Sequence, residues 1–214
     1  MTTAPRPIEI GLNAAIVAVS EGQPLILVAG HDSLPFGPFD PLVHRTFEAG
    51  LRAWVEEQTN LKLGYVEQLY TFADRGRDPR ERQGGPRVIS IGYLALVREV
   101  QPGGAGDGIW QHWYHYFPWE DWRDGKPAVL DKTIRPLLER WARAGASAEE
   151  RLDRTHRIAT TFAPGGGWND ERVLERYELL YEAGLVAEAG RDRGLHGEQP
   201  PAFVAPSRGQ PREC

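Results

Sequence analysis

Residues 34–61, LPFGPFDPLVHRTFEAGLRAWVEEQTNL, join a stiff loop to an amphipathic helix, and this stretch decides how the first half of the chain folds. Proline and glycine recur through residues 35–41, so that segment can continue neither a strand nor a helix. Apolar residues then recur every fourth position, which predicts a helix over residues 43–59. The stripe consists of Val43, Phe47, Leu51 and Val55. Asn60 stands where a left-handed cap residue would end the helix.

Strand-like segments flank this loop and helix. Residues 12–19 and 24–29 are apolar and are separated by a short turn, which predicts a hairpin. Residues 61–73 and 87–97 are rich in β-branched and aromatic side chains and are expected to form further strands. The polar loop between them, DRGRDPRERQGGP, carries too much charge to be buried. The first half of the chain is therefore expected to be a sheet with one embedded helix.

The remainder of the chain is expected to be helical. One helix is predicted near residues 133–144, and a second opens at Ser147, where Glu150 completes a capping box. Asn169 begins a third helix and Gly184 ends it. We divide the chain into three parts, which are a first domain, a helical extension and a disordered tail rich in glycine, proline and arginine. Their bounds are residues 1–125, 126–190 and 191–214.

The spacing within residues 34–61 resembles the Nudix box, G-x5-E-x7-R-E-U-x-E-E-x-G-U, in which U is a bulky aliphatic residue. Aligned from its end, the box places Glu57 and Gln58 on the paired glutamates of the family. Trp54 falls where the family has a further glutamate. Gly37 takes the place of the first glycine, with a loop two residues longer than the family pattern.

The family gathers carboxylates on one face of this helix to hold Mg²⁺, and here that face has lost most of them. Opposite the apolar stripe it reads Gly50, Ala53, Trp54 and Glu57, so one carboxylate remains. Mg²⁺ requires several oxygen ligands, and Gln58 adds an oxygen without a charge. We therefore expect no catalytic residue, no metal site and no cofactor. Mg²⁺ enters only if the chain is a divergent hydrolase that uses Glu57 and a carboxylate from elsewhere.

The resemblance extends beyond the box. The segments YTF at residues 70–72, RDPR at 77–80 and RVISIGYLAL at 87–96 resemble those of NrtR-type Nudix regulators of NAD metabolism. This resemblance covers residues 12–97 and implies a Nudix-type α/β/α sandwich with a mixed sheet. It also implies a pocket that senses ADP-ribose-like ligands, joined to a winged-helix DNA-binding domain. The helical extension would then be a remnant of that domain or a linker to it, because residues after 123 contain no clear basic recognition helix.

The resemblance places ligand-binding residues in the loop, on the helix and in the charged segment. They are Gly37, Phe39, Trp54, Glu57, Arg77, Arg80 and Arg87. Guanidinium groups suit bidentate contacts with phosphate. For each arginine taken alone, however, the simpler interpretation is a solvated loop in which acids such as Asp78 pair with the arginines.

Two further segments admit more than one interpretation. Residues 109–122, IWQHWYHYFPWEDW, could stack on a ligand ring, but packing of the helical part or an aromatic-rich dimer interface is the safer interpretation. The helices on either side of residues 163–167 invite a helix-turn-helix interpretation. The second of them is acidic overall, which disfavours contact with DNA phosphates.

Composition limits the remaining options. A net charge of −5 and a pI near 5.7 do not support DNA binding by the chain as a whole. The single cysteine, Cys214, excludes an intrachain disulfide, and the sequence shows no signal peptide and no apolar run of membrane-spanning length, so we expect a cytoplasmic protein. The leading hypothesis is a non-catalytic sensor of a nucleotide-like small molecule. A divergent Nudix hydrolase and a purely structural or dimerising protein are the alternatives.

Overall fold

The chain forms two compact units, which we describe separately. The computed structural model describes residues 7–30, 33–75, 78–82, 84–98, 108–162 and 167–192 of the 214. Unit 1 spans Met1–Trp113 and unit 2 spans Tyr114–Cys214. This division falls after residue 113, whereas the sequence analysis placed a boundary near residue 125. Each unit has a buried apolar cluster of its own.

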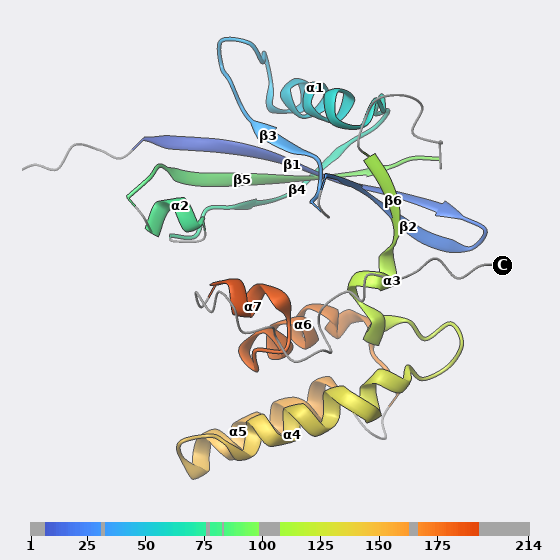
Figure 1. Ribbon diagram of the computed structural model, residues 1–214, viewed down its shortest axis with the longest axis vertical. Helices are drawn as coiled ribbons and strands as arrows, with labels where there is room; N and C mark the ends of the chain where they lie inside the picture. The colour runs from blue at the N-terminus through green and yellow to red at the C-terminus, as the bar shows by residue number, and fades with distance from the viewer. Residues whose placement is uncertain are drawn as a thin grey trace, which may run out of the picture. The chain divides into compact units, whose positions relative to one another are not determined.

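Unit 1 is built on a mixed sheet of six strands among the described residues (Figure 1). The strands are β1 (Ile8–Ser20), β2 (Gln23–Ala29), β3 (Phe36–Pro38), β4 (Glu67–Phe72), β5 (Arg87–Leu96) and β6 (Gly108–His112). Their order is β4-β5-β1-β2-β6, and the short β3 pairs with β1. β1 and β5 run parallel, and the other pairs are antiparallel.

The predicted hairpin is present and is closed by a tight turn. Ser20 pairs with Gln23, so the turn contains Glu21 and Gly22 alone. Both have positive φ, 49° and 76°, as a type I′ turn requires. Such a turn matches the twist of the two strands and fixes the register of β1 on β2.

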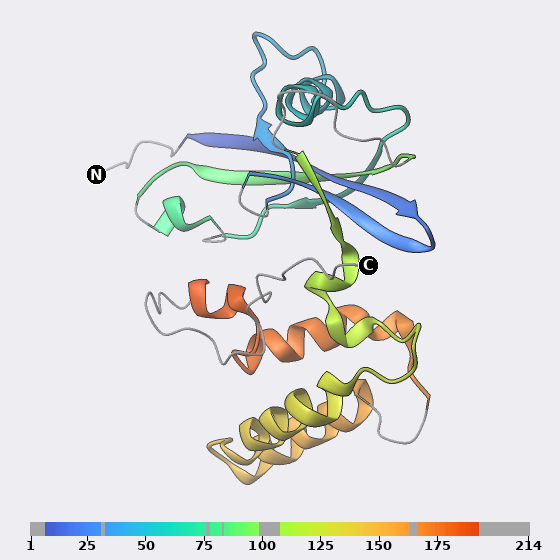
Figure 2. The same cartoon turned by 45° about the vertical axis from the view of Figure 1, so that its right-hand side comes forward.

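Helix α1 (Phe47–Thr59) covers one face of the sheet, and the short helix α2 (Pro79–Arg82) lies on the other face (Figures 1 and 2). Leu51 and Val55 are fully buried against β1 and β5, as the apolar stripe predicts. Val43 is 74% exposed and lies before the helix. The prediction that the helix begins at Val43 is therefore wrong. Thr46, whose side chain caps the helix, sets the true start.

The strand predicted over residues 61–73 is shorter than expected. Only Glu67–Phe72 pairs with β5. The residues before it return the chain from α1, and Leu61, Leu63 and Val66 pack on the core while doing so. Their apolar character therefore reflects packing of a connection and not membership of a strand.

Unit 2 is helical throughout its described residues. Its elements are α3 (Trp113–Tyr116, which begins at the last residue of unit 1), a 3₁₀ turn (Pro118–Glu120), a π-helix η2 (Leu130–Ile134), α4 (Arg135–Arg143), α5 (Ala148–Thr161), a second 3₁₀ turn (Asp170–Arg172), α6 (Val173–Glu182) and α7 (Ala187–Asp192). Helix α4 packs on α5, α5 on α6 and α6 on α7 (Figures 1 and 2). The predicted α/β class, a mixed sheet followed by helices, is confirmed. Among the described helices, none has the length and apolarity that a membrane span requires.

The helix ends of unit 2 follow the predicted capping signals. Ser147 Oγ accepts a hydrogen bond from the Glu150 amide at 3.0 Å, and the Glu150 carboxylate accepts one from the Ala146 amide at 2.6 Å. Gly184, with φ of 73°, lies just beyond the end of α6.

A buried ion pair lies inside the core of unit 2. Arg176 on α6 is 0% exposed, and its guanidinium binds both carboxylate oxygens of Glu120 at 2.7 Å. The same guanidinium lies 3.9 Å from the ring centroid of Trp168 and donates to the Asn169 carbonyl at 2.9 Å. This charge is therefore balanced and hydrogen-bonded where it is withdrawn from water.

Candidate functional site

The predicted box consists of the loop that contains β3 and the helix α1, which is fixed at both ends. Thr46 Oγ1 accepts a hydrogen bond from the Ala49 amide at 3.0 Å. Asn60 adopts the left-handed conformation with φ of 55°, as predicted. Because the stripe of Leu51 and Val55 faces the sheet, the opposite side of the helix is free to meet the loop.

One member of the predicted metal face does not lie on that side. Gly50 is buried, and a Cβ at this position would lie 2.8 Å from His44 Nδ1 and 3.0 Å from Leu12 Cδ1. The prediction that Gly50 belongs to the open face is therefore wrong. Gly50 leaves room for His44 of the loop on one side and for Leu12 of β1 on the other. The remaining outward positions are Ala53, Trp54 and Glu57.

Trp54 packs the outer face of α1 against the loop that contains β3. A Cβ placed on Gly37 would lie 2.2 Å from Trp54 Cδ2, so the indole rests directly on the backbone of β3. The indole Nε1 donates a hydrogen bond to the Pro38 carbonyl at 2.9 Å. The structure thus brings Gly37 and Trp54 together, as the sequence predicts. They meet as packed neighbours.

Gln58 fixes the same loop through its amide. Its Oε1 accepts from the Phe36 amide at 3.1 Å, and its Nε2 donates to the Phe36 carbonyl at 2.6 Å. This reciprocal pair resembles one rung of a β-ladder. The neutral oxygen of Gln58 is therefore bound to β3.

An aromatic row continues from Trp54 along the inner side of the loop. Phe39 meets Phe47 edge-on at 4.6 Å between ring centroids and lies 5.9 Å from His44, which in turn lies 6.2 Å from Trp54. His44 Nδ1 accepts a hydrogen bond from the Asp40 amide at 3.1 Å. Phe39 therefore packs between the loop and the helix. His44 belongs to the same aromatic row, and the sequence analysis did not identify it.

The acidic remnant of the box is exposed. Glu57 points to solvent, and the adjacent Glu56 pairs with Lys62 at 3.4 Å. Within the part of the chain that the structure describes, no group of three or more histidine, cysteine, aspartate or glutamate side chains is placed to hold a metal ion.

Arg80 lies at the corner formed by α2 and the start of β1. Its guanidinium binds Asp78 at 3.1 Å and Glu9 at 3.0 Å. The hydrogen bonds from Arg80 hold the pKa of the Asp78 carboxyl below its usual range, and Asp78 in turn raises the pKa of Arg80. For this arginine, the predicted pairing with an acid of the same loop is confirmed.

Arg87 is bound to a backbone carbonyl. Arg87 Nη2 donates to the Ala73 carbonyl at 2.7 Å, which ties the start of β5 to the end of β4. Among the described residues, no carboxylate forms an ion pair with Arg87. Arg77, the other arginine of the predicted set, lies outside the described residues.

Arg52 is a further residue that the sequence analysis missed. Its guanidinium binds Glu48 at 2.7 Å, donates to the Gly64 carbonyl at 2.6 Å and also binds the Leu63 carbonyl. These bonds fix the segment that leaves α1. The i, i+4 spacing of Glu48 and Arg52 signalled the ion pair, but the backbone partners come from the fold alone.

Each unit contains a cavity among its described residues. In unit 1 a hollow of about 240 Å³ lies beside the β1–β2 turn and is lined by residues that include Glu21, Trp110 and His112. It contains no residue of the predicted ligand set. In unit 2 a cavity of about 340 Å³ is lined by residues of η2, α4 and α5 together with Trp122 and Trp168.

No family model and no curated protein sequence matches the chain. Solved structures do match it. The chain is similar to the NUDIX domain of Shewanella oneidensis NrtR complexed with ADP ribose, with 21% identity over 51% of this chain and 74% of that one and a TM-score of 0.42. It is also similar to Shewanella oneidensis NrtR (16% identity, 79% and 84% of the chains, TM-score 0.43). A mutT/nudix family protein from Listeria innocua matches with 20% identity over 44% and 68% of the chains, with a TM-score of 0.36.

Proposed function

We propose that unit 1 is a non-catalytic sensor of a nucleotide or NAD-related metabolite of the ADP-ribose type, within the transcriptional regulation of NAD metabolism. The ligand class follows from the resemblance of residues 12–97 to NrtR-type regulators. The absence of catalysis rests on one observation, which is the contact of Trp54 with Gly37 and Pro38.

That contact removes the means of holding a metal. Mg²⁺ is bound at near-ideal octahedral geometry by oxygen ligands, usually with carboxylates among them. At the position of a box glutamate this chain has an indole, whose N–H donates and cannot ligate a cation. Gln58 has its oxygen engaged by Phe36, so of the two box positions 57 and 58 only Glu57 offers a solvated carboxylate. Metal-assisted attack on a diphosphate therefore lacks its ligand set.

The arginines differ in what ligand binding would require of them. Arg80 carries two carboxylate partners already, so a diphosphate would have to displace Asp78 or Glu9. Arg87 is held by a carbonyl and keeps its positive charge available. We therefore assign the principal phosphate contact to Arg87, with Phe39, Trp54 and Glu57 forming the loop side of the site. Gly37 is covered by the indole of Trp54. Arg80 lies with α2 on the other face of the sheet and keeps its partners Asp78 and Glu9.

A thermal-shift assay with ADP-ribose, NAD, NADH and ADP, each with and without Mg²⁺, tests this proposal. A ligand present at a hundredfold excess over its Kd stabilises the folded state by about 2.7 kcal/mol, which raises Tm by several degrees. We expect such a shift with ADP-ribose, and we expect it to persist in EDTA. Arg87→Gln should reduce the shift, whereas Arg98→Gln, an equal charge change beyond the other end of β5, should leave it unchanged.

Two outcomes would overturn the proposal. Magnesium-dependent turnover of ADP-ribose or NADH, followed by chromatography of the products, would establish the divergent hydrolase. The absence of a shift with every nucleotide would favour the structural or dimerising protein. If turnover is found, its loss in Glu57→Gln would show that the remaining box carboxylate takes part in it.

A further inference from the structure

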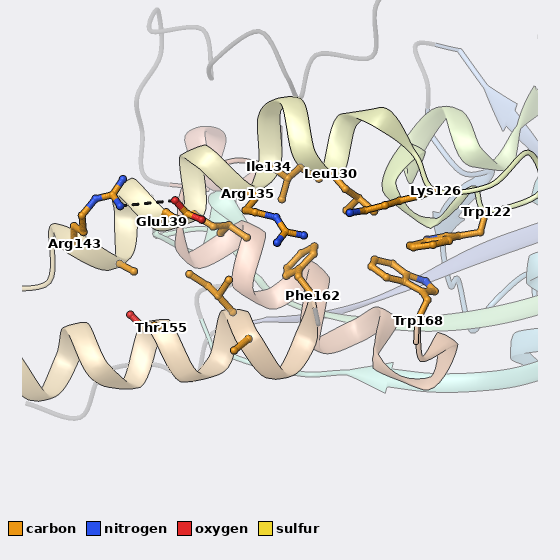
Figure 3. Close-up of a pocket in the computed structure, with 14 residues that line it drawn as sticks. Trp122, Lys126, Leu130, Ile134, Arg135, Glu139, Arg143, Thr155, Phe162 and Trp168 are labelled. Atoms are coloured by element: carbon orange, nitrogen blue, oxygen red, sulfur yellow. Dashed lines mark ion pairs between the residues drawn. The ribbon is translucent and has the colours of Figure 1, made fainter. Parts of the chain in front are cut away.

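The cavity of unit 2 has the size and lining of a small-molecule site. It lies between η2 and α4 on one side and α5 on the other, and its volume of about 340 Å³ is in the range of ligand pockets (Figure 3). Its floor is apolar and buried. The floor residues are Leu130, Ile134, Leu138, Ala142 and Phe162. Helix α5 opposes them with Ile158 and with the exposed Ala159, so the cavity opens to solvent along α5.

One end of the cavity is aromatic. The rings of Trp122 and Trp168 lie 4.7 Å apart between centroids, and Phe162 lies 6.3 Å from Trp168 (Figure 3). The indole N–H of Trp168 donates to Glu120 at 3.2 Å. The indole N–H of Trp122 is buried and has no hydrogen-bond partner among the described residues. A buried donor of this kind is costly unless an acceptor reaches it.

The wall formed by η2 and α4 has an excess of positive charge. Lys126 and Arg135 share the single carboxylate of Asp131, at 2.6 and 3.1 Å. Figure 3 shows the two side chains extending toward one another beside Phe162. Farther along, Arg143 pairs with Glu139 at 3.8 Å. Lys126, Arg135 and Asp131 together carry one net positive charge, so one anionic group at Lys126 and Arg135 would balance it.

The π-helix supplies both the wall and the charge. Leu130 and Ile134, at the two ends of η2, line the cavity, and Asp131 between them orients Lys126 and Arg135. A π turn is a rare departure from the α-helix that is found frequently at functional sites.

We propose that unit 2 binds a small organic anion in this cavity, with a ring-bearing apolar body on the floor and its anionic head between Lys126 and Arg135. The site shares no residue with the one proposed in unit 1. Failure of this proposal would therefore leave the function proposed for unit 1 intact, and failure of that function would leave this site intact.

Two fluorescent probes test the site in the full chain. The first, 1-anilinonaphthalene-8-sulfonate, combines aromatic rings with an anionic group. N-phenyl-1-naphthylamine has the same rings without the sulfonate. We expect saturable binding of the first probe, with one molecule bound per chain. The uncharged probe should bind more weakly, because it lacks the contact with the two cations.

Substitutions separate the apolar body from the anionic head. Ala159→Trp fills the open side of the cavity from an exposed position and should weaken both probes by more than about tenfold, which corresponds to about 1.4 kcal/mol. Arg135→Gln should weaken the sulfonate probe by roughly five- to tenfold and leave the uncharged probe unchanged, because only a charge-assisted contact is lost. His156→Trp on α5 and Arg140→Gln on α4 are the matched controls, since neither residue lines the cavity. Circular dichroism confirms that each variant retains its helices.

Three results would overturn the proposal. The first is binding of both probes that Ala159→Trp does not change. The second is an equal effect of Arg135→Gln on the two probes, which would remove the role assigned to the charge. The third is a wild-type dimer that Ala159→Trp converts to a monomer in analytical ultracentrifugation, in which case a second copy of the chain occupies the cavity.

Discussion

Trp54 illustrates how one side chain alters the chemistry open to a helix face without altering the helix. Its indole lies on Gly37 and donates to the Pro38 carbonyl, so the loop is held by packing and a hydrogen bond. In a metal-dependent site the same loop and helix would be joined through a bound cation. In this chain the contact between loop and helix is made by Trp54 itself.

The Trp54–Gly37 contact gives a direct prediction. Gly37→Ala should destabilise the protein by about 1–3 kcal/mol, because the added methyl meets the indole and forces a shift in a packed site. In a Trp54→Ala background the same substitution should cost less than about 0.5 kcal/mol, since the obstructing ring is gone. Urea unfolding followed by circular dichroism measures both. Equal costs in the two backgrounds would show that the ring does not rest on the glycine.

Replacing Arg176 should destabilise the protein more than any other substitution that we predict. Arg176→Met should lower the free energy of unfolding by about 3–5 kcal/mol, because it leaves the Glu120 carboxylate buried without its partner. Adding Glu120→Gln should restore part of the loss, since the uncompensated charge is then removed. Arg172→Met, one turn away, breaks an exposed pair with Glu175 and should cost less than about 1 kcal/mol. Similar costs for Arg176→Met and Arg172→Met would contradict the assigned burial.

The sequence predicted part of the candidate site, and the limits have physical causes. The box alignment places Gly37, Trp54 and Gln58 on facing elements, and they do meet. The alignment could not predict the hydrogen bonds that join these elements. The partners of Gln58 and Trp54 are backbone groups of β3, which the spacing of residues does not identify. The sequence analysis did not identify Arg176 as a core residue. Its spacing of three and four residues from the buried Leu179 and Leu180 signalled the core.

The ends of elements were predicted where a residue has a local reason to stop or start a helix. Ser147, Asn60 and Gly184 act through the hydrogen bonds or the φ angles of the chain next to them, so the sequence contains their cause. The length of β4 depends on contacts with a distant segment, and the start of α1 depends on the cap Thr46, which the apolar spacing does not reveal. Apolar spacing alone extended both too far, because Val43 lies outside the helix and Leu63 packs on the core from a connection.

The pairing of α5 with α6 should depend on pH. Arg157 binds both oxygens of Glu182 at 2.7 Å, and these hydrogen bonds lower the pKa of the Glu182 carboxyl. A carboxyl whose pKa is lowered on folding stabilises the protein above its unfolded pKa of about 4.3. That stabilisation is lost as the pH falls through the lower folded-state pKa.

The measurement compares wild type with Glu182→Gln in urea unfolding from pH 7 to pH 3. The two should differ by less than about 1 kcal/mol at neutral pH, because both side chains of the pair are more than a third exposed and solvent screens the interaction. The difference should shrink below about pH 4.3. Glu178→Gln on the same helix serves as the control. A difference that grows on acidification would reverse the sign of the argument.

The charge of the chain is distributed unevenly, and this bears on any contact with DNA. The net charge is −5, yet residues 126–143 contain five cationic side chains against two carboxylates. Residues 169–183, where a recognition helix was considered, contain five carboxylates against two arginines. Lys132 and Arg140 take part in none of the described ion pairs. These two cations of η2 and α4 are therefore the ones whose charge is not already neutralised by a described carboxylate. Within these two segments, the positive charge that takes no part in a described ion pair therefore lies on η2 and α4, and not on α6.

This distribution predicts how DNA binding should respond to substitution. At about 150 mM salt a random duplex should bind with a Kd weaker than about 100 µM, because the overall charge opposes the non-specific attraction of a basic protein. Binding to the DNA upstream of the chain's own gene, measured by fluorescence anisotropy, should weaken about tenfold in Lys132→Gln with Arg140→Gln. The slope of the logarithm of the binding constant against the logarithm of the salt concentration should fall in magnitude by about 2, since two phosphate contacts are lost. The pair Lys62→Gln with Arg98→Gln makes the same charge change in unit 1 and should have little effect. Equal losses from the two pairs would mean that net charge governs the interaction, whereas a loss confined to the first pair locates it on η2 and α4.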